Sequence, residues 1–156
     1  MPRLKPASAA PKGEAAGLFV HTMPGHYIRR VQQVAVRLFT EGVNRDMTPV
    51  QFATMLALAE APEIGQAALA SMIGYDRATI GGVIDRLEGK GLVQRAPDPD
   101  DRRSNILTLT AKGISALEAA RPEVEAVQEK LLAPLTPAEQ VDYEAMCRKI
   151  LSAYGG

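Results

Sequence analysis

The 156-residue chain has no tryptophan, three phenylalanines, two histidines and one cysteine. A single cysteine, Cys147, excludes an internal disulfide and any metal site built from cysteine pairs, and it fits the reducing cytoplasm, where we expect the protein to work. The histidines at 21 and 26 form no recognisable catalytic or zinc-binding pattern with it. Glycine-rich phosphate loops, GxSxG and HExxH motifs are also missing, so we expect neither an enzyme nor a metal or cofactor.

An excess of either charge is missing too, since 18 basic residues balance 18 acidic ones. The overall charge therefore favours neither nucleic acid nor a membrane surface as partner. No apolar run approaches the roughly 20 residues of a membrane span. What the chain does have is 46% hydrophobic residues, enough for one domain with a real core.

The periodicity of apolar residues predicts a mostly α protein with one β-hairpin. We expect a disordered arm over 1–20 and a helix over 26–39. Thr48, Pro49 and Gln51 predict a capping-box start for the next helix. Two short helices follow, 66–73 and one that is capped by Asp76 and ends at 89–91.

This pair of short helices has the dimensions of a helix-turn-helix, and the hairpin of 92–95 and 105–109 behind it is a wing. Two helices complete the chain, 111–132 and one that starts at the capping box of Thr136 and runs to Tyr154. We divide the chain into helices at 21–45 and 111–156, expected to form a dimer, and a winged helix-turn-helix at 46–110. The 111–132 helix carries Leu117, Val124 and Leu131 at heptad spacing, with small apolar residues between them. This stripe needs a partner helix, in the same chain or in a second subunit, and we favour a dimer.

Two adjacent glycines, Gly81 and Gly82, stand near the middle of the fourth helix. On a helical wheel Ile80, Val83, Ile84 and Leu87 face the core, whereas Ala78, Gly82, Asp85 and Gly89 face outward. Such a bare face is suited to close approach by another surface, for example the DNA major groove. Tight packing within the protein, or a local kink, is the alternative.

The segment from Asp76 to Gly113 resembles the recognition helix and wing of the MarR family of bacterial winged-helix regulators. The resemblance rests on DRLEGKGLV at 85–93, DPDDRR at 98–103 and LTLT at 107–110, in this order and spacing. It implies a homodimer, held by the first and last two helices, on a pseudo-palindromic DNA operator, with recognition helices in major grooves and wings in minor grooves. The implied DNA-binding residues are Arg77, Ala78, Thr79, Gly81, Gly82, Arg86, Arg102, Arg103 and Ser104.

Within that set the arginines have different expected roles. Arg103 matches the residue that reaches the minor groove in the family, whereas Arg102 is expected to pair with Asp100 or Asp101. Arg86 either contacts a phosphate or pairs with an acid. Many members have a polar pair where this chain has Gly81 and Gly82, so base contacts are expected to shift toward Arg77 and Thr79.

The segment from His21 to Phe39 resembles a subgroup associated with repressors of aromatic acid catabolism. We expect a small aromatic carboxylate, such as a hydroxybenzoate or hydroxynicotinate, to release the repressor from DNA. An arginine suits the carboxylate, and apolar walls suit the ring. The expected ligand-binding residues are His21, His26, Tyr27, Arg29, Arg30, Phe52 and Met55, although each has an ordinary surface or core role as its alternative.

Three other functions remain open at this level. Within the family, an oxidant sensor or a constitutive repressor would need no aromatic ligand, but Cys147 lies on an apolar stripe with no visible base and is expected to pack in the core. The third alternative lies outside this family of DNA-binding regulators: a winged-helix module that binds another protein and no DNA.

Overall fold

The computed structural model describes residues 22–43, 46–100 and 104–154. The predicted arm over 1–20, His21, Arg102 and Arg103 lie outside these ranges. The chain forms two compact units, and the boundary between them in the sequence lies between Val34 and Ala35. Each unit is described by itself. Helix α1 (Pro24–Gly42) crosses this boundary.

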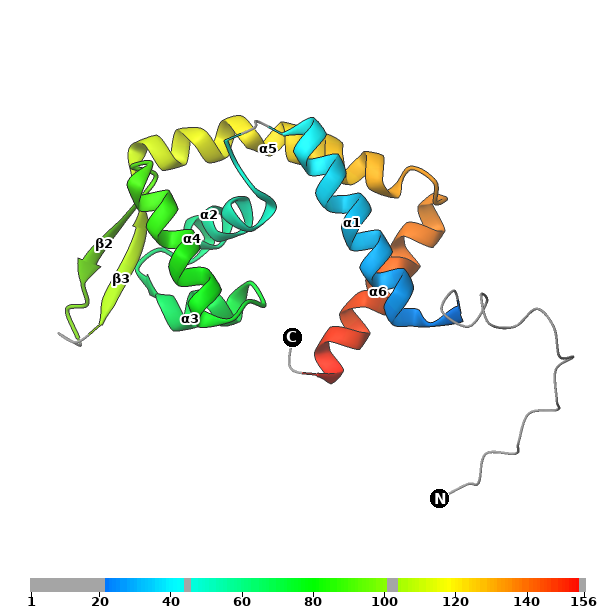
Figure 1. Cartoon of the computed structure of the whole chain (residues 1–156), viewed down its shortest axis with the longest axis horizontal. Coiled ribbons are helices and arrows are strands. Elements are labelled where there is room, and N and C mark those ends of the chain that lie inside the picture. The colour runs from blue at the N-terminus through cyan, green and yellow to red at the C-terminus, as the bar shows by residue number, and fades with distance from the viewer. Residues whose placement is uncertain (1–21, 44–45, 101–103, 155–156) are drawn as a thin grey trace, which may run out of the picture. The chain divides into compact units, whose positions relative to one another are not determined.

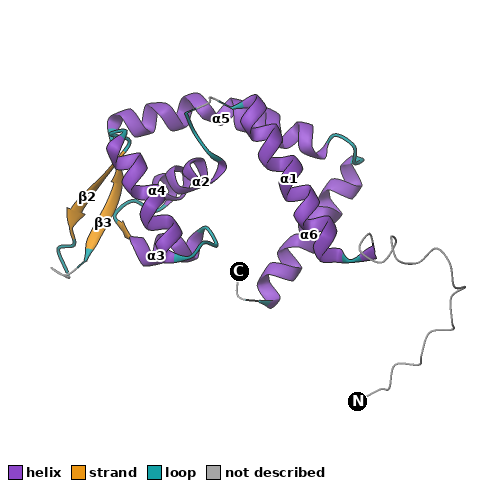
Figure 2. Cartoon of the chain, viewed as in Figure 1, coloured by secondary structure: helices purple, strands orange, loops and turns teal. Residues whose placement is uncertain are grey.

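The other helices are α2 (Pro49–Glu60), α3 (Gln66–Met72), α4 (Arg77–Gly89), α5 (Ala111–Leu132) and α6 (Pro137–Ala153) (Figures 1 and 2). The predicted starts of α2 to α6 are confirmed, whereas α1 extends beyond the predicted 26–39 at both ends. Thr48 and Thr136 each form a complete capping box, and the Asp76 side chain accepts from the Thr79 amide at the start of α4. Gly74 and Gly91 follow the ends of α3 and α4. Their φ angles of 71° and 70° lie in the left-handed region, which glycine adopts without steric cost.

The predicted wing is present as β2 (Val93–Pro97) and β3 (Asn105–Leu109). The prediction of a two-stranded hairpin is incomplete, however, because a third strand, β1 (Ile64–Gly65), pairs with it. The sheet order is β1-β3-β2, and β3 runs antiparallel to both neighbours. Ile64 pairs with Leu107, so the wing is anchored to the residues that lead directly into α3.

The core of the second unit lies between α2, α3, α4, the base of the wing and α5. The four residues of α4 that the wheel assigned to the inner face, Ile80, Val83, Ile84 and Leu87, are at most 2% exposed. This confirms the predicted orientation of α4 about its axis, and therefore which of its residues face outward.

The apolar stripe of α5 is covered within the chain, so the favoured prediction that a second subunit covers this stripe is wrong. Leu117, Ala120, Val124 and Val127 are buried, and Leu131 packs against the same core. Gly42 allows this approach, since a β-carbon at that position would stand 2.7 Å from Val127 Cγ2.

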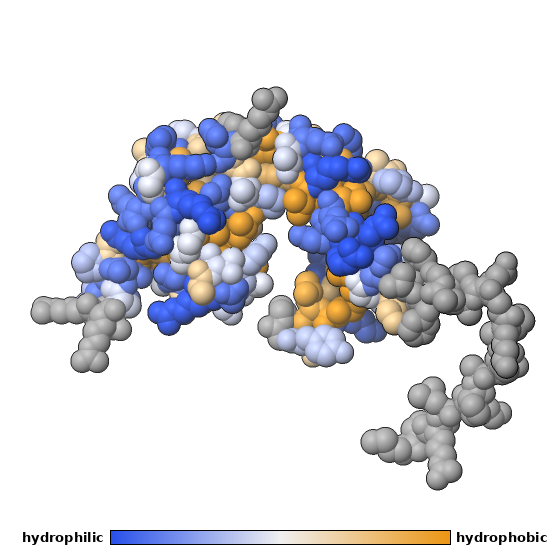
Figure 3. Space-filling view, viewed as in Figure 1, coloured by the Kyte–Doolittle hydropathy of each residue, from blue (hydrophilic) through white to orange (hydrophobic). Residues whose placement is uncertain are grey.

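Helix α6 differs from α5 because it has no buried residue. Its larger apolar side chains, Val141, Met146, Ile150 and Leu151, are each more than half exposed, and Figure 3 shows apolar surface near its C-terminal end. Cys147 is only half-buried, so the expectation that it packs in the core is wrong. Burial, and next a hydrogen bond with the Cys147 thiol, raises the pKa of Tyr143. None of the described helices is both long and apolar enough to span a membrane.

Candidate nucleic-acid interface

The N-terminus of α4 is fixed by Asp76. Its carboxylate accepts a hydrogen bond from the Thr79 amide at 2.8 Å and another from the Thr79 hydroxyl at 2.5 Å. These two bonds, the hydroxyl first, hold the pKa of Asp76 below its usual range. Because the hydroxyl proton of Thr79 is used here, Thr79 can meet another surface only as an acceptor or through its methyl group.

The two glycines of α4 have different surroundings. A β-carbon on Gly82 would meet no atom of the structure within 4 Å, and the same holds for Gly89. A β-carbon on Gly81 would stand 3.0 Å from Nε2 of Gln66. The outward position predicted for Gly82 is confirmed, whereas for Gly81 the packing alternative describes the surroundings better.

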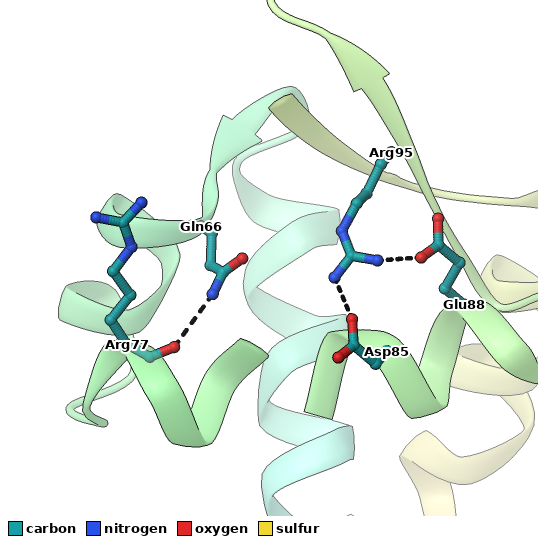
Figure 4. A network of polar contacts seen from close by, with 5 residues as sticks. All are labelled: Gln66, Arg77, Asp85, Glu88 and Arg95. Atoms are coloured by element: carbon teal, nitrogen blue, oxygen red, sulfur yellow. Dashed lines mark hydrogen bonds and ion pairs between the residues drawn. The ribbon is translucent and has the colours of Figure 1, made fainter. Parts of the chain in front are cut away.

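Gln66 joins the two helices of the helix-turn-helix. It is the first residue of α3, and its side-chain amide donates to the backbone carbonyl of Arg77 at 3.1 Å (Figure 4). Since Gly81 has no side chain, the amide can lie over the first turns of α4. Sequence reasoning missed this bond, because its two ends are 11 residues apart and belong to different helices.

Arg95 joins the wing to α4. From the middle of β2 its Nη2 contacts Asp85 Oδ1 at 2.5 Å, and its Nη1 contacts Glu88 Oε2 (Figure 4). The hydrogen bond with Asp85 is the main cause that raises the pKa of Arg95 above its usual value. This residue was absent from the predicted site. The sequence signal is the pair Asp85 and Glu88, two acids one helical turn apart whose mutual repulsion a cation relieves, but this pair does not say which cation.

The other two arginines of α4 remain available. Among the described residues, neither Arg77 nor Arg86 has an ion pair, and both are exposed. Arg95 occupies the nearby acids, so the alternative that Arg86 pairs with an acid finds no support. Ala78 is exposed as well, and the outward side of α4 therefore combines small residues with two unpaired guanidinium groups.

The base of the wing tip is organised by Asp98. Its carboxylate accepts from the Asp100 amide at 2.9 Å and from the Ser104 hydroxyl at 3.1 Å, and its own amide donates to the Ser104 carbonyl at 3.1 Å. Ser104, one of the predicted DNA-binding residues, thus closes the tip turn. The predicted roles of Arg102 and Arg103 fall outside the described residues.

The C-terminal end of α4 meets two other segments through backbone carbonyls. Lys90 Nζ donates to the carbonyl of Asp46, before α2, and Lys112 Nζ donates to the carbonyl of Lys90 at 2.7 Å. Gly113 lies directly against the Leu92 carbonyl, and a β-carbon there would overlap that oxygen. This junction fixes where α4 ends and α5 begins.

The residues predicted to bind a ligand fall into the two units. In the first, Arg29 Nη2 lies 3.3 Å from Nδ1 of His26, and the rings of His26 and Tyr27 meet edge to face at 6.0 Å, while Arg30 is exposed. In the second, Phe52 packs on Phe39 and Met55 is fully buried in the core. Their roles toward a ligand stay a prediction. Among the described residues, no group of three or more His, Cys, Asp or Glu side chains could hold a metal ion.

Comparison with known proteins assigns the family. The MarR family model matches residues 47–104. The HTH-type transcriptional repressor NicR of Pseudomonas putida is 33% identical over 130 residues, which are 83% of this chain and 82% of NicR.

Two solved structures share the fold over most of the chain. PcaV from Streptomyces coelicolor, in complex with its natural ligand, has a TM-score of 0.82 at 32% identity and covers 86% of this chain and 96% of its own. BpsR of Bordetella bronchiseptica, whose DNA binding is regulated by 6-hydroxynicotinic acid, has a TM-score of 0.76 at 31% identity, with 81% and 96% covered. With this agreement in sequence and in overall fold, the chain belongs to the MarR family of winged-helix proteins.

Proposed function

We propose that this protein is a transcriptional regulator that binds operator DNA as a homodimer and is released by a small aromatic carboxylate. The observation that carries the proposal is the outward side of α4, where Gly82 opens onto free space and Arg77 and Arg86 are unpaired. Small residues let a helix backbone approach base edges, and free guanidinium groups neutralise phosphates. Transcription control of this kind takes place in the bacterial cytoplasm.

The dimer is supported by apolar surface that a single chain leaves uncovered. Val141, Ile150 and Leu151 of α6 are 54–66% exposed. In α1, Ile28 is 63% exposed. Exposed apolar side chains that gather on one helix surface indicate an interaction site, whereas singly scattered ones do not. Two recognition helices related by a twofold axis would then enter successive major grooves of a pseudo-palindromic site.

DNA binding is tested by selection from a library of random duplexes. We expect the wild-type protein to enrich a pseudo-palindromic sequence and to bind it with a strong salt dependence. Arg86→Gln and Arg103→Ala should each weaken binding and lower the salt slope, whereas Arg37→Gln, which removes a charge from an exposed pair on α1, should change little. A wild-type protein that enriches no sequence would contradict the proposal.

The effector class is supported by the chemistry at the start of α1. Arg29 and Arg30 offer guanidinium groups to a carboxylate beside the rings of His26 and Tyr27. Among the relatives, BpsR responds to 6-hydroxynicotinic acid.

Release is measured by adding 6-hydroxynicotinic acid or 4-hydroxybenzoate to the complex with the selected duplex. Nicotinamide, which has the ring without the carboxylate, serves as the control. We expect the acids to dissociate the complex and nicotinamide to leave it intact. If no aromatic acid releases the DNA, the effector part is wrong, while DNA binding stands.

A further inference from the structure

The contact of Arg95 with α4 is the strongest polar link between the wing and that helix among the described residues. Its guanidinium reaches two carboxylates at once, and its side chain is only 25% exposed, compared with 67% for Asp85 and 40% for Glu88. A planar, bidentate contact of this kind fixes an orientation, which a single point charge does not.

The place of Arg95 in the sheet extends this constraint to the whole wing. Arg95 is the central residue of β2 and pairs with Leu107 of β3, which in turn pairs with Ile64 of β1. On α4, Asp85 lies on the outward side, one turn beyond Gly82. The link therefore runs from the DNA-facing side of the recognition helix to the strand that carries the wing.

We propose that Arg95 is a positioning residue for DNA binding, which holds the wing at the angle to α4 at which both engage one stretch of duplex. This inference rests on the proposed function. It assigns to Arg95 no contact with DNA. It predicts that loss of the link leaves each element intact but uncouples the wing from the helix.

A different explanation is that Arg95 only neutralises two acids that would repel phosphates. Arg95→Lys separates the two explanations, because lysine retains the charge but cannot bridge both carboxylates as a fork. Arg37→Gln is the matched control for Arg95→Gln, since it also removes one positive charge from an ion pair. Arg37 Nε lies 3.9 Å from Glu41 Oε1 in an exposed pair on α1, which is distant in sequence from the wing.

The test measures affinity for the selected duplex and the hydroxyl-radical footprint on it. We expect both Arg95→Gln and Arg95→Lys to bind about tenfold more weakly than wild type. Both footprints should lose protection at the outer ends, where the wings lie, and retain it at the centre of each half-site. Circular dichroism and gel filtration verify that the variants are folded dimers.

Three results would overturn the inference: wild-type affinity for Arg95→Lys, equal losses for Arg95→Gln and Arg37→Gln, or a full-length footprint for both Arg95 variants. If Arg95→Gln does not fold, Arg95→Lys decides by the same footprint criterion. If the wild-type protein selects no duplex, the proposed function fails and this inference fails with it. If the wild-type protein selects a duplex and the Arg95 variants bind it as tightly, only this inference fails.

Discussion

The side-chain amide of Gln66 lies over Gly81, where a β-carbon would stand 3.0 Å from its Nε2. From this position the amide donates to the Arg77 carbonyl and joins α3 to α4. Gly82, the next residue, faces open space. The adjacent glycines therefore serve different purposes: Gly81 allows a contact within the helix-turn-helix, and Gly82 leaves its outer surface bare.

Alanine substitutions should separate the two glycines by stability. Gly82→Ala should raise the free energy of unfolding by about 0.5–1 kcal/mol, because alanine is the better helix former and its methyl group meets nothing. Gly81→Ala should gain less, since the Gln66 amide must move away. Urea denaturation measures both, and in a Gln66→Ala background the two substitutions should become equivalent. Equal gains in the wild-type background would contradict the packing role of Gly81.

A large side chain at position 82 should block DNA without disturbing the fold. Gly82→Leu adds an apolar group where the structure has free space, so we expect an unchanged dimer by gel filtration. We expect no binding to the selected duplex, because the added side chain would hold the helix backbone away from the base edges. Retained binding would show that this surface of α4 does not enter the groove.

Gly113 should be the glycine least tolerant of substitution in the second unit. A β-carbon there would overlap the Leu92 carbonyl, and backbone atoms at the junction of α4 and α5 cannot move aside as a flexible side chain can. Gly113→Ala should lower the free energy of unfolding by about 3 kcal/mol. Gly89→Ala, in open space at the end of α4, is the control and should be neutral or stabilising.

The cap of α4 should make stability depend on pH in acid. The pKa of Asp76 is lowered in the folded protein, so its carboxylate stabilises the fold above the unfolded-state pKa of about 3.9. That contribution is lost as the pH falls through the lower folded pKa. An asparagine at this position would still cap the helix but cannot titrate. Thermal melts between pH 7 and pH 2 should therefore show a steeper loss below about pH 4 for wild type than for Asp76→Asn. Parallel curves would contradict this role.

Features determined by neighbouring residues could be predicted from the sequence. The caps at Thr48, Asp76 and Thr136 each depend on a contact three residues away, and all are confirmed. The buried side of α4 follows from helical periodicity and is confirmed as well. The outward position of Gly82 follows from the same geometry.

Features that join distant segments could not be predicted in this way. The contacts of Arg95 and Gln66 depend on the tertiary arrangement of β2, α3 and α4, and a charge or amide pattern alone does not identify the partner. Strand β1 has only two residues, too few for any alternation to appear. Its existence depends on the edge of β3 that the β2–β3 hairpin leaves free, and we expect this edge to be completed only after the hairpin has formed.

The completion of that edge has a consequence for the folding pathway. The β2–β3 hairpin joins residues close in sequence, whereas the pairing of Ile64 with Leu107 closes a long loop that contains all of α3 and α4. The entropy cost of that closure is recovered only when both helices are already packed. We therefore expect the hairpin to form early and β1 to join near the end of folding, so that substitutions at Ile64 accelerate unfolding and leave the folding rate nearly unchanged.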